Sequence, residues 1–300
     1  MLDLKKRRQW RDLSESTLGW WLLLPSFLLL ALIVVYPIGR LLVNSFFELR
    51  LADATDATPP FVGWRNYQDI WYDLEFWSSL KNTIWIAIVT VPGALVVGLG
   101  LALLANLPIR QRALVRVSLL LPWALPLSFT GLISAWFFNY DHGLVNDILT
   151  RLGFEPELWL TKPTQAKIAI WLTIIWKTSS FMALILLAGL QMIPRSLYEA
   201  ATVDGASRLQ QFWHITLPML APSMIVALIF RTITAFQTFD VPFTMTHGGP
   251  GYETETLAMY IHKMTIDYLD VGYGSALAVA MFVLSMLVSA VYLRYIGREA

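Results

Sequence analysis

Two ionisable side chains, Lys177 and Arg231, stand inside long apolar stretches of this sequence. A charge at the centre of a bilayer costs at least about 2.5 kcal/mol on insertion scales, so both should face protein or water. Polar and aromatic residues surround them in the sequence: Trp176, Thr178, Ser179, Thr234, Phe236, Gln237, Thr238, Phe239 and Asp240. Guanidinium, amide and carboxylate groups form hydrogen bonds to a polar solute, and aromatic rings stack on its flat faces. These residue types together favour a polar binding pathway.

Spacing supports part of this grouping. Arg231, Thr234 and Thr238 recur at three- and four-residue steps, so they share one helix face, with Gln237 nearby. The candidate pathway residues, led by the first two, are Arg231, Gln237, Asp240, Trp176, Lys177 and Phe236. The alternative for Lys177 and Arg231 is structural: an interhelical ion pair, or a lysine whose ammonium reaches the membrane surface.

Enzyme chemistry finds little support in the sequence. The histidines are scattered without H-E-x-x-H spacing and cysteine is absent, so no catalytic residue and no metal site is expected. No G-x-x-x-x-G-K-[ST] phosphate loop is present, so the chain should not hydrolyse ATP by itself. A formal net charge of +1 gives no basic field for nucleic acid.

The elements that must position these residues are membrane helices. Of 300 residues, 56% are hydrophobic and 14% charged, with mean hydropathy +0.57. A helix of roughly 20 apolar residues crosses a bilayer. Six stretches qualify: Leu18 to Ile38, Ile84 to Leu107, Val117 to Phe138, Ile168 to Ile193, Leu217 to Val241 and Gly274 to Leu293. Prolines 25, 122 and 126 predict kinks. The repeat of Ala94, Gly98 and Ala102 predicts a small face for close helix packing.

The distribution of Lys and Arg predicts the orientation of the spans. With the N-terminus inside, twelve positive and six negative side chains fall in the cytoplasm, against eight and fifteen outside. The inside positive charges are Lys5, Lys6, Arg7, Arg8, Arg11, Arg110, Arg112, Arg116, Arg195, Arg208, Arg294 and Arg298. Both termini are therefore expected inside.

The loop of residues 194–216 is the only sizeable inside structure between spans. Ser196 is expected to cap a short helix through Val203, and Gly205 to end it in the left-handed conformation. Ser207, with a glutamine three residues later, fits a capping box that starts a second short helix.

This second helix is expected to end before Pro218. The pattern thus predicts a helix, a glycine corner and another helix. An amphipathic turn on the lipid surface is the less specific alternative.

The loop carries a resemblance to a known family. Glu199-Ala200-Ala201, Gly205, Ile215 and Leu217-Pro218, at their spacing, resemble the EAA signature of the permease subunits of binding-protein-dependent ABC importers. In that family the loop is the coupling helix, which sits in a cleft of the ATPase subunit. The coupling residues that the resemblance implies are Glu199, Ala200, Ala201, Asp204, Gly205, Ile215, Leu217 and Pro218.

A second resemblance concerns the outer segments. Phe236 to Asp240, Met245 to Pro250, Thr256 with Leu257 and Tyr260, and Gly272 to Ala276 resemble carbohydrate permeases of the maltose, trehalose and glycerol-phosphate type. The match is to the first permease subunit, which pairs with a different second one. The chain departs from enterobacterial maltose permease in having no extra N-terminal spans and no very large outer domain.

The resemblance implies an all-α integral membrane protein with the six-helix type I ABC importer permease fold and both termini cytoplasmic. Residues 1–17 would be a cytoplasmic segment and residues 18–300 the permease domain. The implied partners are a second permease, two ATPases that hold ATP and Mg, and an extracytoplasmic sugar-binding protein. The chain itself would bind no cofactor. It would lie in the cytoplasmic (inner) membrane of a bacterium or archaeon and pass a di- or oligosaccharide.

Two alternatives remain open. An ABC permease for a non-sugar solute shares the Glu-Ala-Ala loop, and only the outer glycine-proline segment argues against it. An ion-coupled secondary transporter would use Lys177, Arg231 and Asp240 as a charge relay, but would leave the capped glycine corner without a role.

Overall fold

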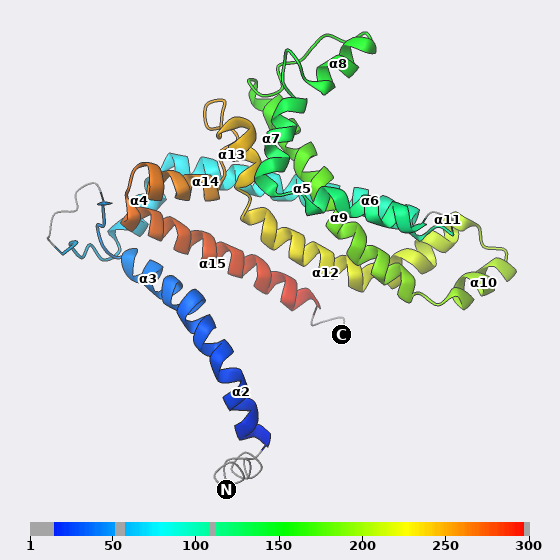
Figure 1. The fold of residues 1–300 in the computed structure, drawn as a ribbon, viewed down its shortest axis with the longest axis horizontal. Coiled ribbons are helices and arrows are strands. Elements are labelled where there is room, and N and C mark those ends of the chain that lie inside the picture. Colours follow the sequence, from blue (N-terminus) through cyan, green and yellow to red (C-terminus); the bar gives the residue numbers. More distant parts are fainter. Residues whose placement is uncertain (1–14, 52–57, 109–111, 297–300) are drawn as a thin grey trace, which may run out of the picture. The chain divides into compact units, whose positions relative to one another are not determined.

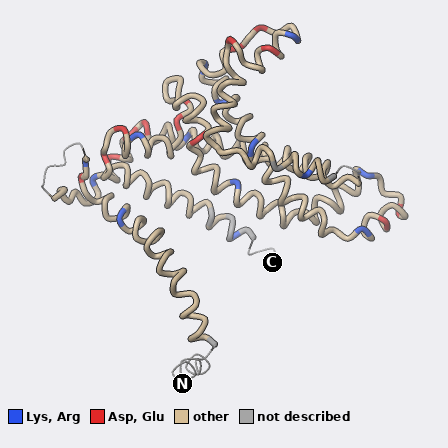
Figure 2. Tube along the Cα trace, viewed as in Figure 1, with Lys and Arg blue, Asp and Glu red and all other residues tan. Residues whose placement is uncertain are grey.

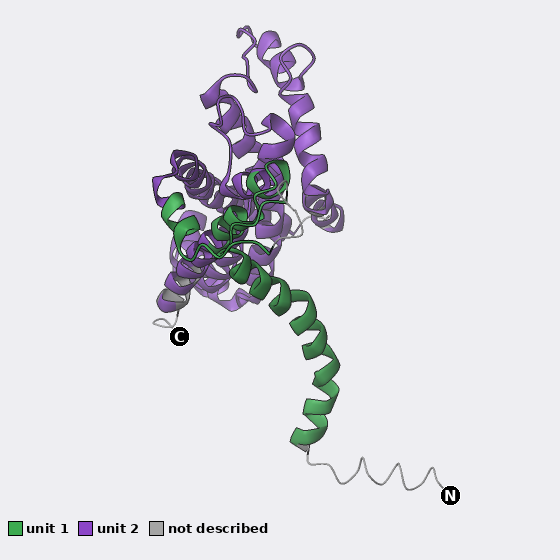
Figure 3. Ribbon diagram, turned by 90° about the vertical axis from the view of Figure 1, so that its left-hand side faces the viewer, with its two compact units in different colours: residues 1–69, 264–279 green, residues 70–263, 280–300 purple. Residues whose placement is uncertain are grey.

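The structure is a computed structural model that describes residues 15–51, 58–108 and 112–296. Most of the N-terminal segment 1–17 therefore lies outside the described residues, as do Lys5, Lys6, Arg7, Arg8, Arg11, Arg110 and Arg298. The described chain is helical, and its β-structure is limited to isolated bridges (Figure 1). It divides into two compact units, which Figure 3 colours separately.

The first unit comprises Met1–Asp69 and Met264–Val279. It holds α2 (Glu15–Leu30), η1 (Ala31–Val35) and α3 (Tyr36–Asn44), which run as one apolar helix, and most of α4 (Arg65–Tyr72) and η4 (Lys263–Asp267). The Leu51 amide donates to the Leu269 carbonyl at 2.9 Å, and the Gly272 amide donates to the Leu49 carbonyl at 3.0 Å. These bonds fasten the chain after α3 to the segment that leads into α15 (Val271–Ile296).

The second unit comprises Ile70–Lys263 and Ala280–Ala300. Its centre is α5 (Leu74–Asn106) packed along α9 (Pro163–Met192), with α12 (Leu217–Phe236) against both (Figure 1). The remaining helices are α6 (Arg112–Ala124), α7 (Leu127–Phe137), α8 (Leu144–Arg151), α10 (Arg195–Val203), α11 (Arg208–Gln211), η3 (Phe212–Thr216), α13 (Asp240–Thr246) and α14 (Leu257–His262).

The predicted small face on α5 is confirmed. Ala94 and Ala102 are fully buried, and a Cβ built on Gly98 would lie 3.0 Å from Met182 Cβ on α9. A larger side chain at Gly98 would push the two helices apart. Small residues thus let the backbones approach closely, as membrane helix pairs require.

Five described helices are long and apolar enough to cross a membrane, or six if the bent pair α6 and α7 counts as one span. The six-span prediction agrees with this, although two spans differ from it in detail. The fifth ends at Phe236 rather than Val241, because α12 stops there and Val241 lies on α13.

The third predicted span is broken rather than kinked. α6 and α7 meet at 93°, with Pro126 at the break, whereas Pro122 stays inside α6. Proline disfavours the helical conformation of the residue before it, here Leu125, and supplies no amide to the preceding turn. Pro25 likewise stays inside α2.

Charged residues are sparse along the central helices of the second unit, where Lys177 and Arg231 are buried. The tube along α5, α9 and α12 carries few charges, while charges gather around α10 and α11, around α14 at the opposite end, and around α8 beyond α7 (Figure 2). This distribution fits helices whose middles lie in hydrocarbon and whose ends lie in water.

Candidate substrate cavity and coupling segment

A cavity of about 100 Å³ lies where α7, α9, α12 and α13 meet. Three of the predicted pathway residues on or after α12 line it together with Lys177. The full lining is Leu127, Ile174, Lys177, Thr178, Arg231, Thr234, Gln237, Thr238, Phe239, Asp240 and Val241. Arg231, Thr234 and Thr238 therefore do open into one space, but the prediction of one shared helix face holds only for the first two, because α12 ends at Phe236.

Arg231 is a buried polar group of this cavity, with 5% of its surface exposed. Its guanidinium donates from Nη2 to Thr90 Oγ1 at 2.8 Å and from Nη1 to Thr234 Oγ1 at 3.2 Å. Its Nε has no hydrogen-bond partner within the described chain, and no described carboxylate forms an ion pair with it. Arginine does not lose its proton in proteins, so the cavity wall carries a positive charge held only by hydroxyls.

Lys177 is held differently. Its ammonium donates to the carbonyls of Pro122 at 2.9 Å and Trp123 at 3.2 Å, and also to that of Leu125. These acceptors belong to the end of α6, where the break leaves carbonyls without helical partners. The ammonium lines the cavity, but its hydrogen bonds satisfy the carbonyls at the helix end. Lys177 therefore forms neither the interhelical ion pair nor the contact with the membrane surface that the sequence suggested as structural roles.

Asp240 begins α13 and is turned toward α7. Its Oδ1 accepts a hydrogen bond from Ser128 Oγ at 2.6 Å. The chain between α12 and α13 is held from outside, because Thr256 Oγ1 donates to the Thr238 carbonyl at 2.7 Å. The segment from Gln237 to Phe239 is thus a fixed wall of the cavity.

Two predicted pathway residues lie elsewhere. Trp176 borders a separate, mainly apolar cavity of about 250 Å³ with Phe137 and Leu172. Phe236 is buried in a cluster with Ala87 and Val91 of α5. Both rings are near Lys177 or Gln237 in sequence, but the helical turn points them to other faces.

Sequence reasoning missed Thr90 and Ser128, which bond to the two charged residues of α12 and α13. A lone threonine or serine in an apolar helix usually bonds its own backbone, so the sequence offered no signal for either.

The predicted corner of the coupling segment is present. Gly205 has φ +80°, in the left-handed region, which confirms it as the turn residue. The capping box is also present: Ser207 Oγ accepts from the Gln210 amide at 3.4 Å, and Gln210 Oε1 accepts from the Ser207 amide at 2.8 Å. The predicted cap at Ser196 is wrong, because α10 already begins at Arg195 after Pro194.

The second helix does not end before Pro218, which corrects that prediction as well. Residues Arg208–Phe236 form one helix of 29 residues that runs from the corner into the cavity wall. A wide turn precedes the proline, in which the Leu217 amide donates to the Phe212 carbonyl, five residues back. Such a local π adjustment accommodates the amide that proline lacks.

The corner presents an exposed surface. No residue of α10 is buried, and Glu199, Ala200, Asp204 and Gly205 are all exposed. Ala201, Ile215 and Leu217 are half-buried, and Pro218 is exposed. Tyr198 Oη shares a hydrogen bond of 2.9 Å with Thr216 Oγ1, which ties α10 to the start of the long helix.

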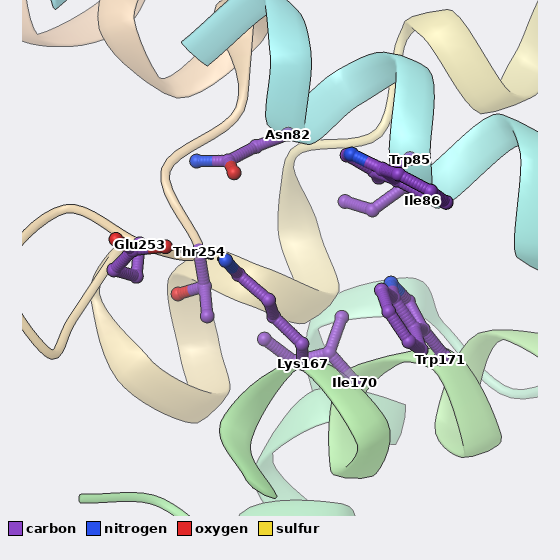
Figure 4. A pocket seen from close by; sticks show the side chains of 8 residues that line it. All are labelled: Asn82, Trp85, Ile86, Lys167, Ile170, Trp171, Glu253 and Thr254. Carbon is purple, nitrogen blue, oxygen red and sulfur yellow. Dashed lines mark hydrogen bonds and ion pairs between the residues drawn. The ribbon is translucent and has the colours of Figure 1, made fainter. Parts of the chain in front are cut away.

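At the other end of the unit, a small hollow of about 10 Å³ has room for about one water molecule. Lys167 pairs with Glu253 on one side of it, and the indoles of Trp85 and Trp171 stand on the side away from Glu253 (Figure 4). The hollow is too small to receive a sugar, so it is not the candidate substrate site.

In the same unit, Lys263 lies between two carboxylates. It pairs with Glu75 and lies 3.4 Å from Glu255 Oε1. Burial, at 4% exposure, raises the pKa of Glu255 to about 7, against the opposing effect of Lys263 and with the help of Glu75. For Lys263, burial lowers the pKa, but the two carboxylates outweigh it and the net direction is upward.

Comparison with known proteins identifies the family to which this chain belongs. Residues 94–298 match the model of the family described as "Binding-protein-dependent transport system inner membrane component". The chain is similar to the sulfoquinovosyl glycerol transport system permease protein SmoG of Agrobacterium fabrum, with 60% identity over 98% of this chain and 95% of that protein. It is also similar to the trehalose/maltose transport system permease protein MalF of Thermococcus litoralis, with 39% identity over 95% of each.

A solved structure shares the fold. The crystal structure of a bacterial ABC transporter involved in the import of the acidic polysaccharide alginate contains a chain that superposes with a TM-score of 0.83. The identity is 23%, and the match covers 97% of this chain and 99% of that one. The expected fold class is thereby confirmed. The family match and the two permease relatives confirm the expectation of a transport subunit rather than an enzyme. The chain is a multi-pass inner membrane permease and belongs to the binding-protein-dependent transport system inner membrane component family.

Proposed function

We propose that this chain is the permease subunit of an ATP-driven sugar importer and forms half of its translocation pathway. The 60% identity to a sulfoquinovosyl glycerol permease, over nearly the full length of both chains, is the observation that carries the sugar class. The trehalose/maltose relative supports the same class. The cavity lined by Arg231, Gln237 and Asp240 would be this chain's part of the pathway.

The segment 194–216 would couple the spans to ATP hydrolysis by docking on an ATPase subunit. Its exposed corner offers small alanines for close approach, and Glu199 and Asp204 offer carboxylates to partner cations. Exposed apolar side chains at Val203 and Leu209 would add contact area.

The long helix Arg208–Phe236 supports a direct mechanical link. It spans roughly 40 Å at 1.5 Å per residue, begins three residues after Gly205 and carries Arg231 near its other end. A displacement of the start of this helix by a closing ATPase would therefore pass along one helix to the cavity wall. The hydrogen bond between Tyr198 and Thr216 would make α10 follow the same motion.

The complete importer would contain a second, different permease, two ATPases and an extracytoplasmic sugar-binding protein. This chain would bind no cofactor, because ATP and Mg would sit on the ATPases. Both termini would be cytoplasmic, with residues 1–17 as a cytoplasmic segment and residues 18–300 as the permease domain. The excess of positive charge on that side supports the orientation.

The charge relay of an ion-coupled transporter is less well supported. It needs Lys177 to exchange partners, whereas three backbone carbonyls at a helix end hold its ammonium. A non-sugar ABC permease would share the coupling corner, so only the transported solute separates it from this proposal.

The test is reconstitution of the complex, purified through a tag on this chain, into proteoliposomes. We expect co-purification of an ATPase and a second permease, and sugar uptake that requires ATP. Gly205→Val, which strains a left-handed backbone, and Glu199→Gln should reduce uptake per ATP hydrolysed at least severalfold. Glu155→Gln, an exposed carboxylate outside the corner, is the matched control. Uptake driven by an ion gradient by the chain alone would overturn the proposal.

A further inference from the structure

Arg231 is a buried cation that the described chain does not neutralise. Its exposed fraction is 5%, its terminal nitrogens meet only threonine hydroxyls, and its Nε meets no acceptor. A buried charge without a counter-charge is costly, and burying an N–H without an acceptor adds to that cost. An anion that visits this position would remove both costs.

We propose that Arg231 is the recognition site for an oxyanion carried by the transported sugar, a sulfonate in the first instance. The inference rests on the proposed function and adds a substrate class to it. The guanidinium is planar and always charged, so it suits the two oxygens that a sulfonate or carboxylate presents side by side.

The balance of charge in the cavity supports an anionic guest. Two cations, Lys177 and Arg231, and one carboxylate, Asp240, line it. The ammonium of Lys177 donates to three carbonyls, which leaves its positive charge uncancelled, and Asp240 accepts from Ser128. Asp240 and Arg231 share the cavity without forming an ion pair in the described chain. The lining is therefore net positive.

The guanidinium is also fixed in place. Thr90 on α5 and Thr234 on α12 hold its two ends from different helices, and Thr234 Oγ1 is itself bonded to the Arg231 carbonyl at 3.0 Å. Each terminal nitrogen carries a second N–H, and Nε carries one more. A group that is pre-oriented with free donors binds an oxyanion with little loss of side-chain entropy.

A selectivity follows from this arrangement. A neutral sugar of the same shape leaves the charge of Arg231 without a counter-charge and its Nε–H without an acceptor. An anionic sugar supplies both. Charge-assisted hydrogen bonds are roughly twice as strong as neutral ones, so we expect a preference of roughly tenfold or more for the anionic sugar at this step.

The experiment uses the complete complex in proteoliposomes and a matched series of labelled glycosides: sulfoquinovosyl glycerol, glucosyl glycerol and glucuronosyl glycerol. They carry a sulfonate, a neutral hydroxyl and a carboxylate at the same ring position. Uptake is measured for the wild type and for Arg231→Gln, Arg231→Lys and Arg151→Gln. The last removes an exposed arginine on α8 and is the control for loss of one positive charge.

For each variant, the ratio of anionic to neutral uptake is divided by the same ratio in the wild type. All variants share one binding protein, so the selectivity of the binding protein cancels in this comparison. We expect this ratio to fall roughly tenfold in Arg231→Gln, to fall less in Arg231→Lys, and to stay unchanged in Arg151→Gln. A larger fall for the sulfonate than for the carboxylate would support the sulfonate, and the reverse would overturn that assignment.

An unchanged ratio of anionic to neutral uptake in the Arg231 variants would overturn the inference about Arg231. If these variants still take up sugar in an ATP-dependent manner, the proposed function would stand. If Arg231→Gln loses the second permease on gel filtration, Arg231→Lys decides. A normal ratio there would overturn the inference. Absence of ATP-dependent uptake of all three glycosides by the wild type would overturn both proposals.

Discussion

Lys177 on α9 donates a hydrogen bond of 2.9 Å to the carbonyl of Pro122 on α6, at the end of a helix that a neighbouring proline breaks. A side chain that the sequence marks as a possible transport group thus closes a helix terminus. The contact joins α9 to the bend between α6 and α7, beside the cavity.

Replacing Lys177 with Met should destabilise the protein. The carbonyls of Pro122, Trp123 and Leu125 would lose their shared donor, and unsatisfied buried polar groups cost about 1–3 kcal/mol each when no water reaches them. We expect a lower midpoint of thermal unfolding in detergent, with Lys177→Arg less affected. Lys81→Met, at an exposed position, is the control. An unaltered midpoint in Lys177→Met would show that the three bonds contribute nothing.

The packing of α5 on α9 predicts opposite results for two neighbouring glycines. A Cβ on Gly98 would lie 3.0 Å from Met182 Cβ and 3.0 Å from the Ser179 carbonyl oxygen, whereas a Cβ on Gly100 would meet nothing within 4 Å. Gly98→Ala should therefore cost about 1–3 kcal/mol through overpacking. Gly100→Ala should be neutral or slightly stabilising, because alanine is the better helix former. Chemical denaturation in mixed micelles measures both, and equal effects would count against the close approach.

The carboxyl of Glu255 predicts a dependence of stability on pH. Burial raises its pKa to about 7 from an ordinary value of 4.5, so the folded state holds the proton more tightly than the unfolded state. The resulting stabilisation is fully present below pH 4.5 and is lost as pH rises through about 7. The shift corresponds to about 3 kcal/mol at most.

The measurement is the difference in unfolding midpoint between wild type and Glu255→Gln from pH 4.5 to 8. The variant cannot ionise at this position, so the wild type should lose stability relative to it as pH rises. Glu75→Gln should shift the transition to lower pH, because the Glu75 carboxylate raises the pKa of Glu255. A parallel course of wild type and Glu255→Gln would refute the assignment.

The coupling corner distinguishes two serines. Ser207 closes a capping box, whereas Ser196 lies within α10 and caps nothing in the described structure. Ser207→Ala should lose about 0.5–2 kcal/mol of local stability, and Ser196→Ala should lose little. Hydrogen exchange of the amides of Gln210 and Gln211 would report it, with faster exchange only in Ser207→Ala. The same rate in both variants would mean that the box does not hold the corner.

Much of the fold follows from local properties of the sequence. Length and hydropathy of the apolar stretches predict the spans, because a helix that satisfies its own backbone is the stable structure in hydrocarbon. The spacing of Ala94, Gly98 and Ala102 predicts the packing face of α5. The left-handed turn at Gly205 and the box at Ser207 were predictable for the same reason, since each depends on residues within one helical turn.

The contacts within the candidate cavity depend on which helices pack together. Arg231 reaches Thr90, a residue 141 positions away, and Lys177 reaches carbonyls 52 to 55 positions away, so neither contact leaves a local pattern. The same holds for Trp176 and Phe236, which are near the cavity in sequence but face other clusters.

The sequence by itself determined a membrane protein with a capped glycine corner, because hydropathy and turn chemistry act between neighbours along the chain. The permease family followed from the resemblance of the residues around that corner to a known signature. Only the tertiary structure decided that one helix runs from just after the corner past Arg231, and that Lys177 closes the end of α6. It also decided that the Arg231 side chain has only threonine hydroxyls as partners within the described chain. The physical reason is that a buried polar group takes its partners from whichever helices pack against it, and packing is a property of the whole fold.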